Sequence, residues 1–149
     1  SRHQKNEENE KVNFNEIIKD VVKKYENKEI DISVEENLEI NIRPNSIKRC
    51  LANLVDNGLS YGRKVKILVK KTLNKVIIFV DDDGPGIPEK EYYNVMKPFY
   101  RIDKSRGQNQ SGVGLGLSIA NDIIHSHGGN ISLEKSPLSG LRVKISLPF

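Results

Sequence analysis

The sequence predicts an α+β fold: a two-layer α/β sandwich in which three helices cover one face of a mixed, mostly antiparallel sheet. Three observations predict it. Three segments carry apolar residues at helical spacing, and short segments of alternating hydrophobicity stand in pairs between them. The length of 149 residues suits one domain with one core, and no internal repeat is present.

The first eleven residues, 1–11, are almost wholly polar and charged, so we expect a linker remnant ahead of a single domain over residues 12–149. The domain opens with a predicted helix whose apolar positions recur every three or four residues: Phe14, Ile17, Ile18, Val21, Val22 and Tyr25. Alternating apolar residues then predict two short strands, over 30–34 and 38–42, joined by a polar turn at 35–37.

Pro44 opens the second predicted helix, because proline suits a first helical turn, and this helix ends at Tyr61. Two strands follow, over 64–72 and 75–80, with a two-residue hairpin loop between them. The remaining predicted elements are a helix from about Gly114 to Gly128 and strands over 130–134 and 141–147.

The composition narrows the function classes. Hydrophobic residues make up 36% of the chain and charged residues 30%, which is typical of a soluble globular domain. The net charge is +4, but the lysines are scattered among acids and no aromatic and basic strip is present, so we expect no nucleic-acid partner. The longest apolar run, 76–80, is far too short to span a membrane. The lone Cys50 is expected to be a buried small hydrophobe.

Two asparagines, Asn53 and Asn57, stand one helical turn apart in the second predicted helix. They lie beside its apolar stripe, at the rim of the core, where a cleft would be. An amide oxygen is a neutral, hard ligand suited to Mg²⁺, which keeps waters and phosphate oxygens in its other coordination positions. The alternative is that both are ordinary helix-surface side chains.

The segment 82–88 directly follows a hydrophobic strand. A carboxylate at the strand end, Asp82, could accept a hydrogen bond from the adenine amino group, and a charge-assisted bond of that kind contributes roughly 1.5–3 kcal/mol. Gly84 and Gly86 would let the backbone approach a flat ring. Two alternatives are an ordinary turn and a metal cluster of the aspartates at 81–83, although consecutive residues point in different directions.

Glycines at 112, 114 and 116 lead into the third predicted helix. Such glycines expose backbone N–H groups to an anion, and the helix N-terminus adds a favourable partial charge, which together would bind phosphate. The spacing matches neither the dinucleotide fingerprint nor the Walker loop. A flexible glycine hinge is the alternative.

The segment 97–101 is followed by a polar loop, 103–111, between the predicted adenine and phosphate segments. We expect Phe99 to anchor the base of this loop, and Arg101 or Arg106 to reach phosphate oxygens. A loop in that place would act as a lid. Taken alone it could be a solvated surface loop, but the order and spacing of all four segments favour a nucleotide site.

In this order the four segments resemble the motifs of the catalytic and ATP-binding domain of sensor histidine kinases, within the gyrase, Hsp90, histidine kinase and MutL ATPase class. The matching segments are 53–57 (N box), 82–86 (first glycine box), 98–99 (F box) and 112–117 (second glycine box). The resemblance extends over about 14–147 and implies a Bergerat-type ATP-binding fold. Three segments are most similar to the osmosensor kinases of this family: 46–49, 52–55 and 82–87.

The resemblance implies ATP and Mg²⁺ as cofactors. By position, Asn57 would hold Mg²⁺, Asn53 would be the catalytic residue near the phosphates, and Asp82 would bind the adenine amino group. The other implied nucleotide contacts are Gly58, Leu59, Ser60, Tyr61, Gly84, Gly86, Ile87, Arg101, Ile102, Arg106, Val113, Gly114, Leu115, Gly116 and Leu117. Among these, Tyr61, Ile87 and Leu117 would help to line the pocket for the adenine base.

Two positions depart from the family pattern. Ser60 stands where the family often has lysine or arginine, so one phosphate-binding cation is missing or is replaced from the lid. Gly58 stands where alanine is common, which costs about 0.5–1 kcal/mol of helix stability.

The resemblance also implies the reaction: transfer of the γ-phosphate of ATP to a histidine on a separate dimerisation segment. None of the three histidines resembles that acceptor. ATPases of the class carry a glutamate four residues before the metal-binding asparagine, whereas Asn53 stands here, and an amide is no general base. Hydrolysis should therefore be slow. An ATPase or serine kinase of the same fold, or a degenerate nucleotide-binding module suggested by Ser60, remain the alternatives.

The implied partners are the dimerisation and phosphoacceptor helices of the same kinase and the receiver domain of a response regulator. The resemblance further implies that the chain is a cytoplasmic domain of a sensor kinase of the bacterial inner membrane. Both expectations rest on the family and not on composition.

Overall fold

The computed structural model describes residues 7–100, 102 and 113–149, without the side chains of 113–116. Its strands are β1 (Glu10–Asn13), β2 (Glu29–Val34), β3 (Glu39–Ile42), β4 (Lys64–Lys71), β5 (Lys75–Asp82), β6 (Asn130–Lys135) and β7 (Leu141–Pro148). Its α-helices are α2 (Phe14–Val22), α3 (Pro44–Tyr61) and α4 (Val113–Ser126). Three 3-10 helices are η1 (Lys23–Tyr25), η2 (Glu89–Glu91) and η3 (Asn94–Met96).

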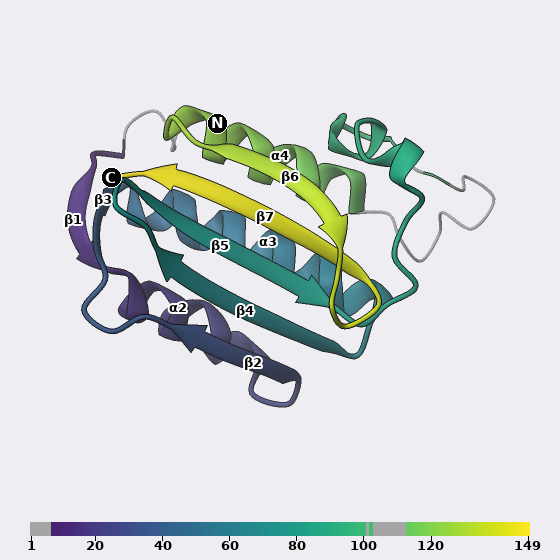
Figure 1. Ribbon diagram of the computed structural model, residues 1–149, viewed down its shortest axis with the longest axis horizontal. Helices are drawn as coiled ribbons and strands as arrows, with labels where there is room; N and C mark the ends of the chain where they lie inside the picture. The colour runs from purple at the N-terminus through teal and green to yellow at the C-terminus, as the bar shows by residue number, and fades with distance from the viewer. Residues whose placement is uncertain (1–6, 101, 103–112) are drawn as a thin grey trace.

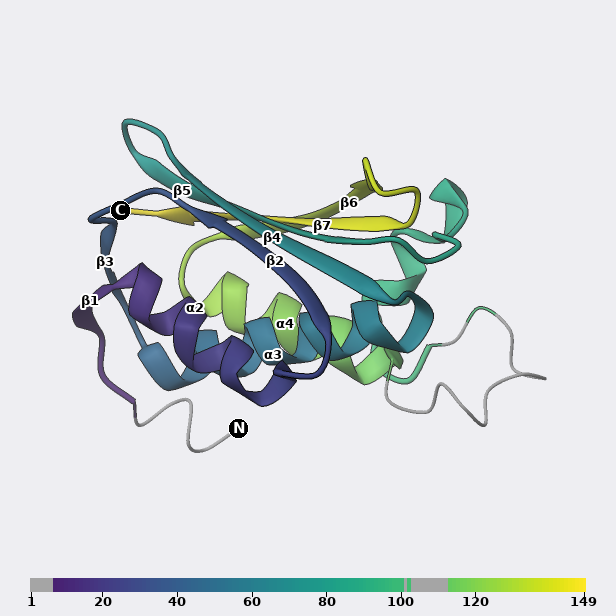
Figure 2. The same cartoon turned by 90° about the horizontal axis from the view of Figure 1, so that it is seen from below.

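These elements form two layers. A five-stranded sheet in the order β2-β4-β5-β7-β6 makes one layer, and α2, α3 and α4 lie against the same face of it (Figures 1 and 2). The β2–β4 pair is parallel and the other three pairs are antiparallel. The predicted α+β sandwich with a mixed, mostly antiparallel sheet is therefore confirmed.

The core lies between the two layers because each strand turns alternate apolar side chains toward the helices. The central strands bury Val65, Ile67 and Val69 on β4, Val76, Ile78 and Val80 on β5, and Val143, Ile145 and Leu147 on β7. Cys50 is fully buried on α3, as predicted, and burial raises the pKa of its thiol to about 12. None of the described helices combines the length and apolar character needed to cross a bilayer.

The pairing of the two short strands was predicted wrongly. Both β2 and β3 exist, but they do not pair with each other: β2 pairs with β4 in parallel, and β3 pairs with β1 in a separate two-stranded sheet. Alternating hydrophobicity identifies a strand and its buried face, but it carries no information about the neighbour. The turn between the two strands joins two different sheets.

The segment before the domain also contributes structure. Residues 10 and 11, assigned from the sequence to the linker, belong to β1. Further back, the Glu7 carboxylate accepts hydrogen bonds from the backbone N–H groups of Asn45 and Ser46, at 2.7 and 2.9 Å, and from the Ser46 hydroxyl. Arg43, at the N-cap of α3, makes no side-chain cap. Glu7 therefore caps α3 from outside the helix, in the position that its dipole favours.

We expect Glu7→Ala to lower the free energy of unfolding by about 1 kcal/mol, because two N–H groups at the start of α3 lose their acceptor. For a chain of this length the melting temperature should fall by about 2–4 °C. Glu8→Ala, an exposed position on the same segment, is the matched control and should leave it unchanged. Equal melting temperatures for the two variants would contradict the cap.

Candidate functional site

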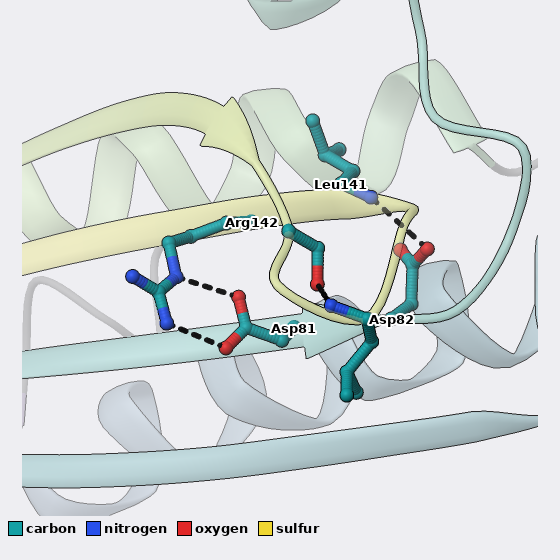
Figure 3. A network of polar contacts seen from close by, with 6 residues as sticks. Asp81, Asp82, Leu141 and Arg142 are labelled. Carbon is teal, nitrogen blue, oxygen red and sulfur yellow. Dashed lines mark hydrogen bonds and ion pairs between the residues drawn. The ribbon is translucent and has the colours of Figure 1, made fainter.

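Asp82 is the last residue of β5, and its carboxylate is held from two sides. The backbone N–H groups of Gly84 and Leu141 donate to Oδ1, at 2.9 and 3.1 Å, and the N–H of Gly140 donates to the Asp82 carbonyl, at 3.1 Å. Figure 3 shows the contact between the Asp82 carboxylate and the Leu141 nitrogen. Among the described residues, the hydrogen bonds to this carboxylate all end on Oδ1. Its second oxygen is thus left to accept from a ligand.

The surroundings of Asp82 make its charge costly. The side chain is only 5% exposed, and burial is the main cause that raises the pKa of this carboxyl above its usual range. The negative charges of Asp83 and Asp81 raise it further, while the two N–H donors to Oδ1 oppose the rise. A buried carboxylate with one unused oxygen is a functional-site candidate, because such an arrangement weakens the fold unless a ligand uses it.

Helix α3 approaches Asp82 at Gly58. A Cβ added to Gly58 would lie 2.8 Å from Val65 Cγ2 and 3.7 Å from Asp82 Oδ2. The departure from alanine noted in the sequence therefore has a packing reason in this chain, because no side chain fits there. About one turn further along α3 is Tyr61, whose Cβ would lie 3.1 Å from a Cβ added to Gly84. The loop after β5 therefore packs directly on the end of α3. The end of α3, directly after the predicted N box, thus meets the predicted first glycine box.

Asn57 precedes Gly58 and is 6% exposed. Its Oδ1 is buried, and no donor from the described residues reaches it. A buried amide oxygen without a donor is costly, and it is the neutral hard ligand that Mg²⁺ accepts. Asn57 therefore fits the metal position expected for it. The described residues contain no cluster of three or more histidine, cysteine and acidic side chains, so phosphate oxygens and waters would complete the coordination.

Sequence reasoning missed the turn between β6 and β7. Gly140 packs so closely on Asp82 that an added Cβ would lie 2.0 Å from its Oδ1 and 2.6 Å from its carbonyl oxygen. In the sequence, Gly140 looks like any glycine in a turn before a strand. Asp82, the residue that it contacts, is 58 positions away in the sequence. Only the pairing of β5 with β7 brings the two together.

We expect Gly140→Ala to lower the free energy of unfolding by about 1–3 kcal/mol, as overpacking does when the neighbours cannot move aside. The obstructing atoms belong to a buried carboxylate and to backbone, so the added methyl displaces Asp82 and nucleotide binding falls as well. Ser139→Ala in the same turn is the control, because that exposed position already carries a side chain. Denaturant unfolding and nucleotide titration of both variants check the prediction; a Gly140→Ala variant as stable as the control would contradict it.

The comparison with known proteins agrees with this geometry. Residues 42–149 match the family described as "Histidine kinase-, DNA gyrase B-, and HSP90-like ATPase". The chain belongs to this family. Its relatives include the sensor histidine kinase GtrS of Pseudomonas aeruginosa, 43% identical over 106 residues, which cover 71% of this chain and 22% of GtrS. Sensor histidine kinase CpxA of Escherichia coli K12 is 39% identical over 107 residues, which cover 71% of this chain and 23% of CpxA.

Solved structures of the family share the fold. The nucleotide-free catalytic domain of histidine kinase ThkA superposes with a TM-score of 0.82 at 30% identity, over 95% of each chain. The histidine kinase domain of the E. coli osmosensor EnvZ superposes with a TM-score of 0.71 at 33% identity, over 93% of this chain and 88% of that one. The chain spans less than a quarter of the length of GtrS and CpxA.

The other predicted family positions fall in several parts of the structure. Asn53 is half-buried and lines a groove between α2 and α3, together with Asp20, Lys24, Lys48, Arg49 and Asp56. Ser60 is exposed, and its hydroxyl donates to the Asp56 carbonyl at 2.8 Å. Leu59 and Ile87 are partly buried against the core, and Leu117 is a core residue with 1% exposure. The contacts of these residues with a nucleotide stay predictions.

The segment expected to form a lid is only partly described. Phe99 was expected to anchor its base, but the side chain is 78% exposed and its backbone has φ of +64°, so that prediction is wrong. Tyr100 makes the anchor instead, through hydrogen bonds from its hydroxyl to the Glu91 carboxylate. Ile102 is 44% exposed. Arg101 and Arg106 lie outside the described residues, as do the side chains of Val113, Gly114, Leu115 and Gly116.

Proposed function

We propose that this domain binds Mg²⁺–ATP and donates the γ-phosphate to a histidine on a separate dimerisation segment, as the catalytic domain of a sensor histidine kinase. The observation that carries the proposal is the Asp82 carboxylate, buried at the strand end with Oδ1 occupied and Oδ2 left for a base. Membership of the histidine kinase and gyrase ATPase family supports the nucleotide, and the similarity to sensor kinases supports the acceptor.

In this proposal Asp82 accepts a hydrogen bond from the adenine amino group, and Gly84 and Gly86 keep the loop close to the ring. Asn57 Oδ1 would ligate Mg²⁺, and the ion would supply positive charge that neutralises the phosphates. The first turn of α4 directs backbone N–H groups to the phosphates. Phosphoryl transfer depends mainly on such positioning, because the protein contributes little covalent chemistry.

The family contains both ATPases and kinases, and Asn53 favours the kinase. Its amide cannot remove a proton from water at neutral pH, so the position lacks a base for hydrolysis. Asn53 also lies one helical turn before Asn57, the residue proposed to hold Mg²⁺, on the same side of α3. We propose that it acts near the phosphates without activating water.

By analogy with the sensor kinases it resembles, we propose that the domain works with the dimerisation and phosphoacceptor helices of its own kinase and with a response regulator receiver domain. The parent protein would be an inner-membrane sensor with this domain on the cytoplasmic side. The structural similarity to EnvZ favours an osmosensor-like kinase.

The decisive experiment mixes the chain with radiolabelled ATP, Mg²⁺ and a separately produced dimerisation domain of a sensor kinase. We expect acid-labile, base-stable phosphate on the acceptor, and none when its histidine is replaced by alanine.

A parallel sample without acceptor should release phosphate very slowly. Rapid ATP turnover in that sample would favour an ATPase of the same fold. Failure to bind a non-hydrolysable ATP analogue would favour a degenerate module, the alternative that Ser60 suggests.

A further inference from the structure

Three consecutive residues, 140–142, contact both Asp81 and Asp82. The N–H of Gly140 donates to the Asp82 carbonyl and the N–H of Leu141 to its Oδ1, each at 3.1 Å. The Arg142 guanidinium donates from Nε and Nη2 to the two carboxylate oxygens of Asp81, at 2.7 and 2.9 Å. Figure 3 shows the Arg142–Asp81 and Leu141–Asp82 contacts near the point where β5 ends and β7 begins. One short segment thus holds two adjacent aspartates.

The Arg142–Asp81 pair is rigid. Asp81 and Asp82 are neighbours in β5, so their side chains point to opposite faces of the sheet, with Asp82 on the helix side. The Asp81 side chain is only 2% exposed, and the Arg142 guanidinium also stacks over the Phe79 ring at 4.1 Å. A two-point contact between a guanidinium and a carboxylate fixes position as well as charge. Arg142 therefore links β7 to β5 beside Asp82.

Asp82 is the middle residue of three consecutive aspartates, and the carboxylate of each neighbour has its own partners. Asp83 accepts hydrogen bonds from the N–H groups of Arg63 and Lys64, and Asp81 is paired with Arg142. The other charged or titratable groups facing this region are Lys64 and Lys66 on β4, Glu134 on β6 and Tyr61 at the end of α3. The Lys64 ammonium group forms ion pairs with Glu29 and Asp31 on β2. Arg142 is thus the cation bound directly to the aspartate that precedes Asp82.

We propose that Arg142 is a positioning residue for nucleotide recognition: by neutralising Asp81 and fixing residues 140 and 141, it keeps Asp82 ionised with Oδ2 turned to the base. The proposal rests on the proposed role of Asp82. Burial raises the pKa of Asp82, and the charges of Asp83 and Asp81 add to the rise, so an unpaired Asp81 would favour its protonation. A protonated Asp82 loses the charge that strengthens its bond to an amino group.

The test compares Asp81→Asn, Arg142→Gln and the double variant in the full chain, using titration with the imido analogue of ATP and Mg²⁺ between pH 5 and pH 8. Binding requires ionised Asp82, so affinity falls as pH decreases through its pKa. At pH values where Asp82 is partly protonated in the parent, we expect Asp81→Asn to bind about three times more tightly than the parent, and Arg142→Gln about three times more weakly. The double variant should return to the parental pH profile. Glu39→Gln, in the remote exposed pair with Lys11, is the control and should change nothing.

Arg142→Lys separates the two parts of the role, because it keeps the charge and loses the two-point contact. It should restore the pH profile but not the full affinity. The ¹³C carboxyl shift of Asp82, followed against pH without nucleotide, gives a second readout that does not depend on ATP binding. It should titrate at lower pH in Asp81→Asn and at higher pH in Arg142→Gln.

Loss of affinity by the same factor at every pH in Arg142→Gln would overturn the proposal, since it would indicate a purely structural role. If that variant does not fold, Asp81→Asn decides alone: an unchanged pH profile and an unchanged Asp82 titration would overturn it. A parent chain that binds no ATP analogue at any pH would overturn the proposed function instead. The carboxyl titration would then still report whether Arg142 controls the charge of Asp82.

Discussion

Asp82→Asn is expected to reduce the affinity for ATP by about 100-fold, with or without Mg²⁺, the equivalent of about 2.7 kcal/mol. The reason lies in how the carboxylate is held. The N–H groups of Gly84 and Leu141 both donate to Oδ1, so in the variant the amide oxygen must take that position. The amide nitrogen then replaces Oδ2 and presents a donor to the adenine amino group, itself a donor. Isothermal titration with a non-hydrolysable ATP analogue measures the loss.

The neighbouring carboxylate provides the matched control for this substitution. Asp83 accepts from the N–H groups of Arg63 and Lys64, at 2.8 and 3.0 Å, and so ties the loop to the start of β4. Asp83→Asn keeps an oxygen for those donors and should bind the analogue within about threefold of the parent. Two results would contradict recognition of the adenine by Asp82. One is an Asp82→Asn variant whose affinity also stays within threefold of the parent, and the other is an Asp83→Asn variant that loses as much affinity as Asp82→Asn.

The helices and most of the strands could be predicted from the sequence because each of them buries only one of its faces. Helix α3 runs over Pro44–Tyr61, as its apolar spacing and its proline indicated, and the alternating residues of β4, β5 and β7 mark their buried face. The strand partners were harder to predict. Nothing local to 30–34 indicates that β2 lies parallel to β4, because a parallel neighbour is chosen by packing across a long connection.

The same distinction holds for the candidate site. The sequence identified Asp82, Asn57 and Gly58, whose chemistry can be recognised from neighbouring residues, and the fold brings their segments together. It missed Gly140 and Arg142, because their role depends on contacts across 58 and 61 positions of chain with Asp82 and Asp81. It also misassigned Phe99. An aromatic residue next to a loop suggests an anchor, but a positive φ turns this side chain to solvent.

Asn57→Ala is expected to remove the Mg²⁺ dependence of nucleotide binding while leaving the fold at least as stable. In the parent, Oδ1 is buried without a donor from the described residues, and an unsatisfied polar group of this kind costs about 1–3 kcal/mol. Alanine removes that cost and, with it, the metal ligand. A residue kept for stability would behave in the opposite way.

The measurement compares the affinity for the ATP analogue in Mg²⁺ and in EDTA, together with the melting temperature of the nucleotide-free chain. The parent should bind about tenfold more tightly with Mg²⁺, and Asn57→Ala should bind equally in both. Asn45→Ala, an exposed asparagine at the start of the same helix, should keep the parental ratio, since its contact to Glu7 uses the backbone N–H. If Asn57→Ala keeps the Mg²⁺ effect and melts at a lower temperature, Asn57 is a structural residue. The cation would then be held by other oxygens, and the buried Oδ1 of Asn57 would have to find its donor within the protein, because an unpaired amide in the core is costly.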